Sequence, residues 1–138
     1  MALSLFPEGM MGSSSEMTLD SIKAKLNYFE LQAQELHWQT FGLGEHEALG
    51  DLYNNIFSVK DEIVEKIMGY LGTRTKAMPT DPIKNYTPGF PNQLAVEIIS
   101  FAKQLENFGK SNNMPDIENI AQSLSGDTAK IKYRLTLT

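Results

Sequence analysis

Apolar residues recur every three or four positions in four separate stretches of the chain, and this spacing limits the fold more than any other feature. Such a spacing places the apolar side chains on one face of an α-helix. The sequence therefore predicts four amphipathic helices, at about residues 17–41, 45–71, 91–110 and 115–135. The apolar positions of the second helix are Leu49, Leu52, Ile56, Val59, Ile63, Ile67 and Tyr70.

The connections between the predicted helices differ greatly in length. Glycines at 42 and 44 indicate a tight turn after the first helix, whereas GTRTKAMPTDPIKNYTPGFPN, with four prolines, predicts a long connection over residues 72–91. Gly126 is expected to interrupt the fourth helix, and the terminal RLTLT could be extended. Residues 1–15, with their glycines and three serines, are expected to form a flexible N-terminal arm. Two short turns and one long connection predict an all-α four-helix bundle with a crossover between the second and third helices.

Length and composition exclude several classes of protein. At 138 residues the chain suits one domain with its own core, and without cysteine it has no disulfide, thiolate zinc site or thiol nucleophile. The net charge is −5 and no lysine or arginine precedes Lys23, so direct DNA binding is not expected. No stretch is apolar over the roughly 18 residues of a membrane span, and the N-terminus lacks a signal-peptide pattern. These features predict a soluble, cytoplasmic protein.

Two carboxylates stand out on the second predicted helix. Asp61 and Glu65 are four residues apart, so they share one face, roughly opposite the apolar face that builds the core. A second, partial apolar stripe lies beside them and consists of Tyr53, Phe57, Val64, Met68 and Leu71. A helix with two apolar faces buries both or presents one to a partner. The stripe therefore predicts a homo-oligomer.

The two histidines of the chain suggest what such an oligomer could bind. His46 precedes Asp61 by fifteen residues, which is about 22 Å along a helix, so one copy cannot bring both to one metal ion. Two copies of the helix packed antiparallel about a two-fold axis can, giving two equivalent sites per dimer. His37, across the short turn, could join the histidine half. Imidazole nitrogen and carboxylate oxygen together suit Fe(II), Zn(II) or Mn(II).

Simpler interpretations of the same residues remain open. An acidic pair on an exposed helix face is often only solvated charge, and the adjacent Lys60 and Lys66 could neutralise it. His37 could be a satisfied core or interface histidine, and Trp38 is expected to pack in the core. His46 could be an ordinary polar residue of a first helical turn.

Three motifs resemble the Dps family (DNA protection during starvation), the small ferritin-like proteins. They are LHW at 36–38, HEALGDLY at 46–53 and DEIVEKI at 61–67. The family pattern is an HW pair, an LHE-x-x-D segment, and D-x-x-x-E fifteen residues after the second histidine. The spacing from His46 to Asp61 matches that register.

The resemblance implies a ferritin-like bundle and a di-iron ferroxidase site shared between two-fold-related subunits. It implies oxidation of Fe(II) by peroxide or dioxygen and storage of ferric oxide in a shell of twelve subunits, which limits oxidative damage. Zn(II) or Mn(II) could replace the iron. The candidate metal ligands are His37, His46, Asp61 and Glu65.

The chain also departs from the family pattern. Gly50 stands where the family has an aspartate, and the turn between the histidines is three residues shorter than usual. Asp51 and Glu47 are therefore reserve candidates for a missing carboxylate ligand. The alternative function is a non-enzymatic ferritin-like structural or adaptor subunit, for example phage-encoded, that has lost the complete metal site.

Overall fold

The computed structural model describes residues 17–137, and this part of the chain contains four helices and no strand. The prediction of an all-helical chain with four helices is confirmed. The helices are α1 (Leu19–Gln39), α2 (Leu43–Leu71), α3 (Phe90–Ser111) and α4 (Pro115–Arg134). The predicted N-terminal arm, residues 1–15, lies outside the described residues.

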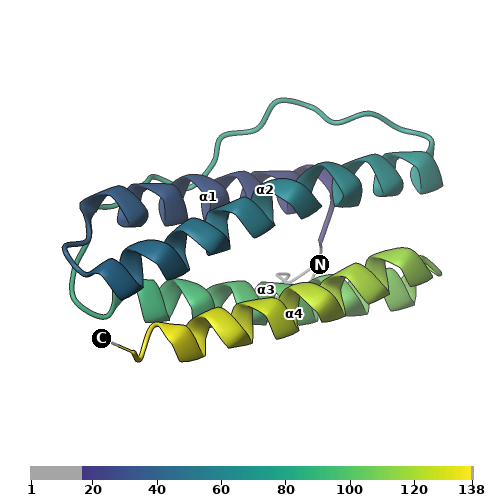
Figure 1. Ribbon diagram of the computed structural model, residues 1–138. Coiled ribbons are helices and arrows are strands. Elements are labelled where there is room, and N and C mark those ends of the chain that lie inside the picture. The colour runs from purple at the N-terminus through teal and green to yellow at the C-terminus, as the bar shows by residue number, and fades with distance from the viewer. Residues whose placement is uncertain (1–16, 138) are drawn as a thin grey trace, which may run out of the picture.

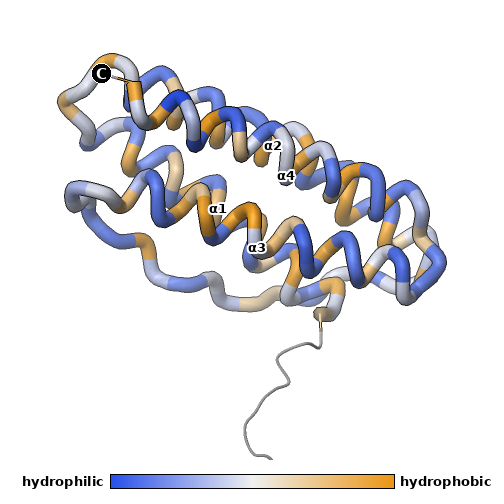
Figure 2. Tube along the Cα trace, turned by 90° about the horizontal axis from the view of Figure 1, so that it is seen from below, coloured by the Kyte–Doolittle hydropathy of each residue, from blue (hydrophilic) through white to orange (hydrophobic). Residues whose placement is uncertain are grey.

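The four helices stand at the corners of a square. α1 lies beside α2, and α3 lies beside α4 below them (Figure 1). α1 packs mainly against α2 and α3 mainly against α4, while contacts between α2 and α4 join the two pairs. Hydrophobic positions alternate with hydrophilic ones along every helix (Figure 2), as the spacing predicts. The largest fully buried side chains include Ile22, Leu26, Phe29, Leu52, Ile56, Ile98 and Leu105.

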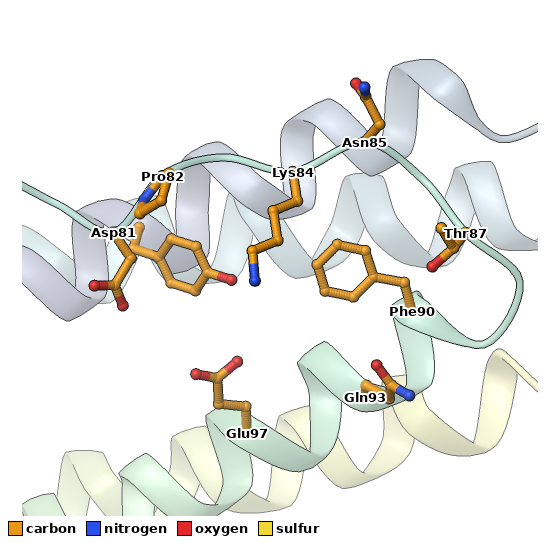
Figure 3. A pocket seen from close by; sticks show the side chains of 9 residues that line it. Asp81, Pro82, Lys84, Asn85, Thr87, Phe90, Gln93 and Glu97 are labelled. Atoms are coloured by element: carbon orange, nitrogen blue, oxygen red, sulfur yellow. The ribbon is translucent and has the colours of Figure 1, made fainter.

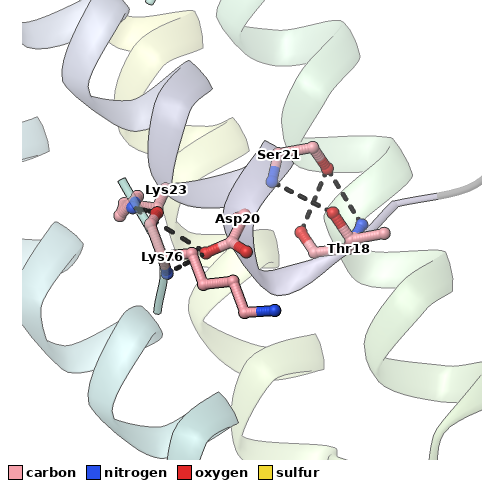
Figure 4. A network of polar contacts seen from close by, with 5 residues as sticks. All are labelled: Thr18, Asp20, Ser21, Lys23 and Lys76. Carbon is pink, nitrogen blue, oxygen red and sulfur yellow. Dashed lines mark hydrogen bonds and ion pairs between the residues drawn. The ribbon is translucent and has the colours of Figure 1, made fainter. Parts of the chain in front are cut away.

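Local sequence signals set the helix ends. Thr18 caps α1 in a capping box: its hydroxyl accepts from the Ser21 backbone N–H at 3.1 Å, and the Ser21 hydroxyl accepts from the Thr18 N–H at 2.9 Å (Figure 4). Gly72 ends α2 in the left-handed region at φ 69°, which a residue without Cβ adopts freely. Pro115 is the first residue of α4, where its missing N–H leaves no hydrogen bond unmade.

Three expectations from the sequence are corrected. α4 continues through Gly126 to Arg134, because one glycine in a helix that packs along its length costs only about 1 kcal/mol. Residues 135–137 form a turn rather than an extended segment. Tyr70 is 47% exposed instead of belonging to the core. Lys66 pairs with Asp116, which is in the first turn of α4, so the N-terminal end of α4 lies at the level of Lys66. Tyr70 is one helical turn further along α2, where α4 does not cover it.

The connection of residues 72–89 runs along α1 and is held there by α1 side chains (Figure 1). The fully buried amide of Gln32 donates to the backbone oxygen of Lys84 at 2.9 Å and accepts from its N–H at 2.8 Å. Near the start of α1, Asp20 accepts from the backbone N–H of Lys76 at 2.8 Å, and Lys23 donates to the Lys76 carbonyl (Figure 4). Hydrogen bonds to its backbone therefore fix the connection on α1, and the packing of Tyr86 against the core adds to them.

None of the helices in residues 17–137 is both long and apolar enough to cross a membrane.

Candidate metal centre

The two histidines form a stacked pair where α1 ends and α2 begins. Their ring centroids are 3.8 Å apart and the ring planes differ by 16°. The Nδ1 of His37 lies 2.6 Å from the backbone oxygen of His46, and the Nδ1 of His46 lies 2.8 Å from the backbone oxygen of His37. A carbonyl oxygen can only accept, so each Nδ1 carries a hydrogen and the Nε2 of each neutral ring keeps its lone pair. Metal-binding histidines in proteins are commonly held in this way.

A small polar network holds the turn between the histidines. The hydroxyl of Thr40 donates to Glu45 at 2.6 Å, and the hydroxyl of Tyr86 donates to the same carboxylate oxygen at 2.8 Å. The hydrogen bond to Glu45 raises the pKa of Tyr86 above its usual value. Tyr86 comes from the long connection, so sequence spacing gave no signal for this support. The network ties the connection to the end of the bundle that carries the histidines.

Gly50 is the residue against which the His37 ring packs. A Cβ at position 50 would lie 3.0 Å from Cε1 and 3.2 Å from Nδ1 of His37. The edge of the ring thus fills the space that a side chain at this position would need. The imidazole of His37 therefore lies at the position where the family pattern has an aspartate.

The candidate carboxylates lie further along α2 and are exposed. The neighbouring lysines turn away from them: Lys60 pairs with Glu30 on α1 at 2.6 Å, and Lys66 pairs with Asp116 on α4 at 3.6 Å. Within residues 17–137, neither Asp61 nor Glu65 has an ion-pair partner. The two lysines therefore do not neutralise the acidic pair.

The two reserve carboxylates differ in their surroundings. Asp51 pairs with Arg134 of α4 at 2.7 Å, which holds its side chain towards α4. Glu47 is exposed and has no ion pair among the described residues. Of the two, Glu47 is the carboxylate that a metal ion near the histidines could reach without breaking an ion pair.

One copy of the chain therefore holds the candidate ligands in two separate groups, here called the histidine and carboxylate half-sites, rather than in one complete site. α2 is continuous from Leu43 to Leu71, so about 22 Å still separates the levels of His46 and Asp61. Within residues 17–137, no three histidine, aspartate or glutamate side chains lie close enough together to hold a metal ion. The structure brings the histidines together, but it does not bring them to the carboxylates of the same copy.

Apolar side chains are exposed around both half-sites. Trp38 is 63% exposed, which corrects the expectation that it packs in the core. Phe57, from the outer stripe of α2, is 62% exposed, and Leu71 is 47% exposed. Tyr53 is only partly exposed because its ring meets the His37 ring edge-on, at a centroid distance of 5.3 Å.

A separate pocket of 640 Å³ lies between the long connection and α3. Figure 3 shows the side chain of Lys84 extending from the connection towards Glu97 on α3. Lys25 bridges Glu97 at 3.2 Å and Asp81 at 3.1 Å. Burial opposes its charge, but these two hydrogen bonds outweigh that effect and raise the pKa of Lys25 above its usual value. Acidic and basic groups balance here, and no candidate metal ligand lines the pocket.

Comparisons of the chain with known protein families, with curated proteins and with solved structures found no match. The interpretation of the two half-sites therefore depends on their own geometry and on the spacing of the motifs.

Proposed function

We propose that this chain is a ferritin-like subunit, similar to those of the Dps family, that binds Fe(II) as its substrate between two copies and oxidises it. Two helix pairs joined by a connection along the length of the bundle support the ferritin-like assignment. In the proposed shell, ferric oxide collects inside and oxidative damage is limited. Twelve subunits follow from the resemblance alone, and a cytoplasmic location remains the expectation from the composition of the chain.

The observation that carries the proposal is the reciprocal pair of hydrogen bonds between the histidines. Each ring is fixed by a backbone carbonyl at 2.6 or 2.8 Å, and each is left with an Nε2 lone pair for a metal ion. Two histidines that served only for packing would not need both rings held in this tautomer. The arrangement matches the outer-shell support that orients imidazole ligands in metal sites.

The stacking also bears on how many ions the site takes. An imidazole binds a metal along a lone pair that lies in the plane of the ring, at a distance of about 2.1 Å. Two nearly parallel rings 3.8 Å apart cannot both place one ion in their planes. Each ring then serves its own ion, and two-metal sites in proteins hold their ions about 3.5–4 Å apart. The ring geometry therefore supports a pair of iron ions.

A second copy supplies the missing carboxylates. An antiparallel α2 related by a two-fold axis brings Asp61 and Glu65 of the partner to the histidines, with Glu65 able to bridge two ions. The absence of an ion-pair partner for either carboxylate within residues 17–137 leaves both available to a cation. Nitrogen and oxygen donors in this combination suit Fe(II), and Zn(II) or Mn(II) would compete for the same place.

The proposed reaction balances with peroxide as the oxidant. Two Fe(II) ions each give up one electron, the O–O bond of hydrogen peroxide breaks, and two hydroxide ions form. The ferric ions then hydrolyse to the stored oxide. Two Fe(II) ions bound side by side at the proposed site would supply the two electrons together.

A second candidate is the non-enzymatic ferritin-like structural or adaptor subunit. The observation that favours it is Gly50, because the aspartate of the family pattern is missing and a Cβ at this position would crowd the His37 ring at 3.0 Å. In this case the two-fold pairing is kept for assembly, and the histidine pair only closes the turn.

A test of the proposed function is an anaerobic Fe(II) titration of the purified assembly, followed by hydrogen peroxide, with the ferric-oxo absorbance recorded. We expect saturable binding of about two iron ions per site and rapid oxidation. His46→Ala and Asp61→Ala should each abolish both while leaving the assembly intact. Binding that is no stronger than in these variants would favour the structural subunit.

Mixing the two inactive variants tests whether the site is shared. A dimer of one His46→Ala copy and one Asp61→Ala copy contains one site with both ligands intact and one site with neither. Random reassociation of equal amounts should therefore restore about a quarter of the wild-type sites. No recovery, when mixed dimers are shown to form, would contradict a site built from two copies.

A further inference from the structure

The turn between α1 and α2 presents an exposed apolar end to the bundle. Phe41 is fully exposed, Leu43 is 71% exposed and Trp38 is 63% exposed. The histidine pair and the hydrogen bond from Thr40 to Glu45 hold this turn in place. Apolar side chains grouped on a fixed surface indicate a contact with another molecule.

The other end of α2 carries a second apolar group. Tyr70 and Leu71 are each 47% exposed, and Met68, which packs in part against the core, keeps part of its surface exposed. Met68 follows Asp61 by seven residues, close to two helical turns, so both lie on the same side of α2. This apolar group therefore borders the carboxylate half-site, as the exposed turn borders the histidine half-site.

The register of the proposed site shows how the two groups meet. This step rests on the proposed function, in which His46 lies opposite residues 61–65 of the partner. In an antiparallel pair, moving five residues back along one helix moves the opposing position five residues forward along the other. Phe41 lies in the turn, two residues before α2 begins at Leu43, so it lies near the level of residues 66–70 of the partner. Met68 is the residue in that range that shares a side of α2 with Asp61.

We propose that Phe41, with Trp38 and Leu43 beside it, docks on Met68 and Leu71 of a second copy and covers the outer edge of the shared metal site. The two-fold axis repeats this contact at both ends of the helix pair. A phenylalanine can bury roughly 150–250 Å² in such a contact. The contact removes exposed apolar surface from both copies and excludes bulk water from the side of the site nearest the turn.

The absence of cysteine from the chain makes the contact directly measurable. The double variant Phe41→Cys/Met68→Cys is oxidised mildly with diamide and analysed on a non-reducing gel. We expect a disulfide-linked dimer, because a disulfide forms only where the two Cα atoms lie within about 7 Å. The matched control is Phe41→Cys/Val96→Cys, since Val96 is 48% exposed on α3 and lies outside the proposed contact. Each single variant should remain uncrosslinked.

The outcomes separate this inference from the proposed function. If the wild type binds Fe(II) but the 41–68 pair forms no more dimer than the 41–96 pair, the docking inference is wrong and the proposed function stands. If the 41–68 pair forms dimer selectively while the wild type binds no Fe(II), the docking stands and the ferroxidase is wrong. As a second measurement, Phe41→Ser should weaken dimerisation in sedimentation at least about tenfold. Ile83→Ser, at a 38% exposed position on the connection, should leave it unchanged.

Discussion

Substituting alanine for Gly50 tests the contact on which the histidine pair depends. The new Cβ would lie 3.0 Å from Cε1 of His37, closer than an ordinary carbon–carbon contact, so the ring must move. Its movement also breaks or lengthens the bond from Nδ1 to the backbone oxygen of His46, now 2.6 Å long. We therefore expect Gly50→Ala to release the His37 ring from its present orientation.

Two opposing effects set the size of the change in stability. Replacing glycine by alanine within a helix stabilises it by about 1 kcal/mol. Crowding a packed position destabilises by about 1–3 kcal/mol. Gly126 in the interior of α4 offers the matched control, because a Cβ there meets nothing within 4 Å. Gly126→Ala should raise the free energy of unfolding by about 1 kcal/mol. The free energy of unfolding of Gly50→Ala should be lower than that of Gly126→Ala by about 2 kcal/mol.

Urea denaturation followed by circular dichroism, at one protein concentration for all variants, measures both free energies of unfolding. Fe(II) titration of the same samples should show a loss of affinity of about 10- to 100-fold for Gly50→Ala, the range found when the support of a ligand is removed. Equal stabilisation by Gly50→Ala and Gly126→Ala would refute the close packing of His37 on α2. Unchanged iron affinity would show that the orientation of His37 does not matter for binding.

Three further changes test other parts of the structure. Gly109→Ala should destabilise by about 3 kcal/mol in urea denaturation, because its Cβ would lie 2.8 Å from the backbone nitrogen of Glu118, which cannot move aside. Gln32→Leu should leave the backbone N–H and C=O of Lys84 without their partners and cost about 1–3 kcal/mol, and limited proteolysis should then cut the connection faster. Because the pKa of Lys25 is raised, its ammonium group loses its proton only above pH 10.5 in the folded chain. The free energy of unfolding should therefore fall as the pH rises from 10.5 through the folded pKa, and less steeply in Lys25→Met, as urea titrations at alkaline pH would show.

Periodicity predicted the helices because burial on one face is a local property of a sequence. Leu49, Leu52 and Ile63 are fully buried, as their three- and four-residue spacing indicates. Tyr70 continues the same spacing but is exposed, because burial also needs a neighbouring helix and the N-terminal end of α4 lies one turn short of Tyr70. Spacing along one helix contains no information about where the next helix ends.

The candidate site was predictable only in part, for a related reason. The helix rise separates His46 from Asp61 whatever the rest of the chain does, so the need for a second copy follows from the sequence. The direction of Lys60 does not follow from it, since it depends on Glu30 of another helix, whereas Lys66 pairs with Glu62 on its own helix as well as with Asp116 of α4. The packing of His37 on Gly50 was equally hidden, because it depends on how the short turn places two helices.

The pairing of α1 with α2 and of α3 with α4 has a consequence for how the chain can be divided. Each pair is a helical hairpin closed by a short turn, so most contacts join residues near in sequence, an arrangement that favours rapid folding. The connection between the hairpins is held to α1 at a few backbone positions. If the chain is split within residues 77–80, the two hairpins should thus reassemble as separate polypeptides. The part of the connection before the split then stays attached to the α1–α2 hairpin. The candidate metal ligands would then all lie on one fragment, and the other could be exchanged without altering them.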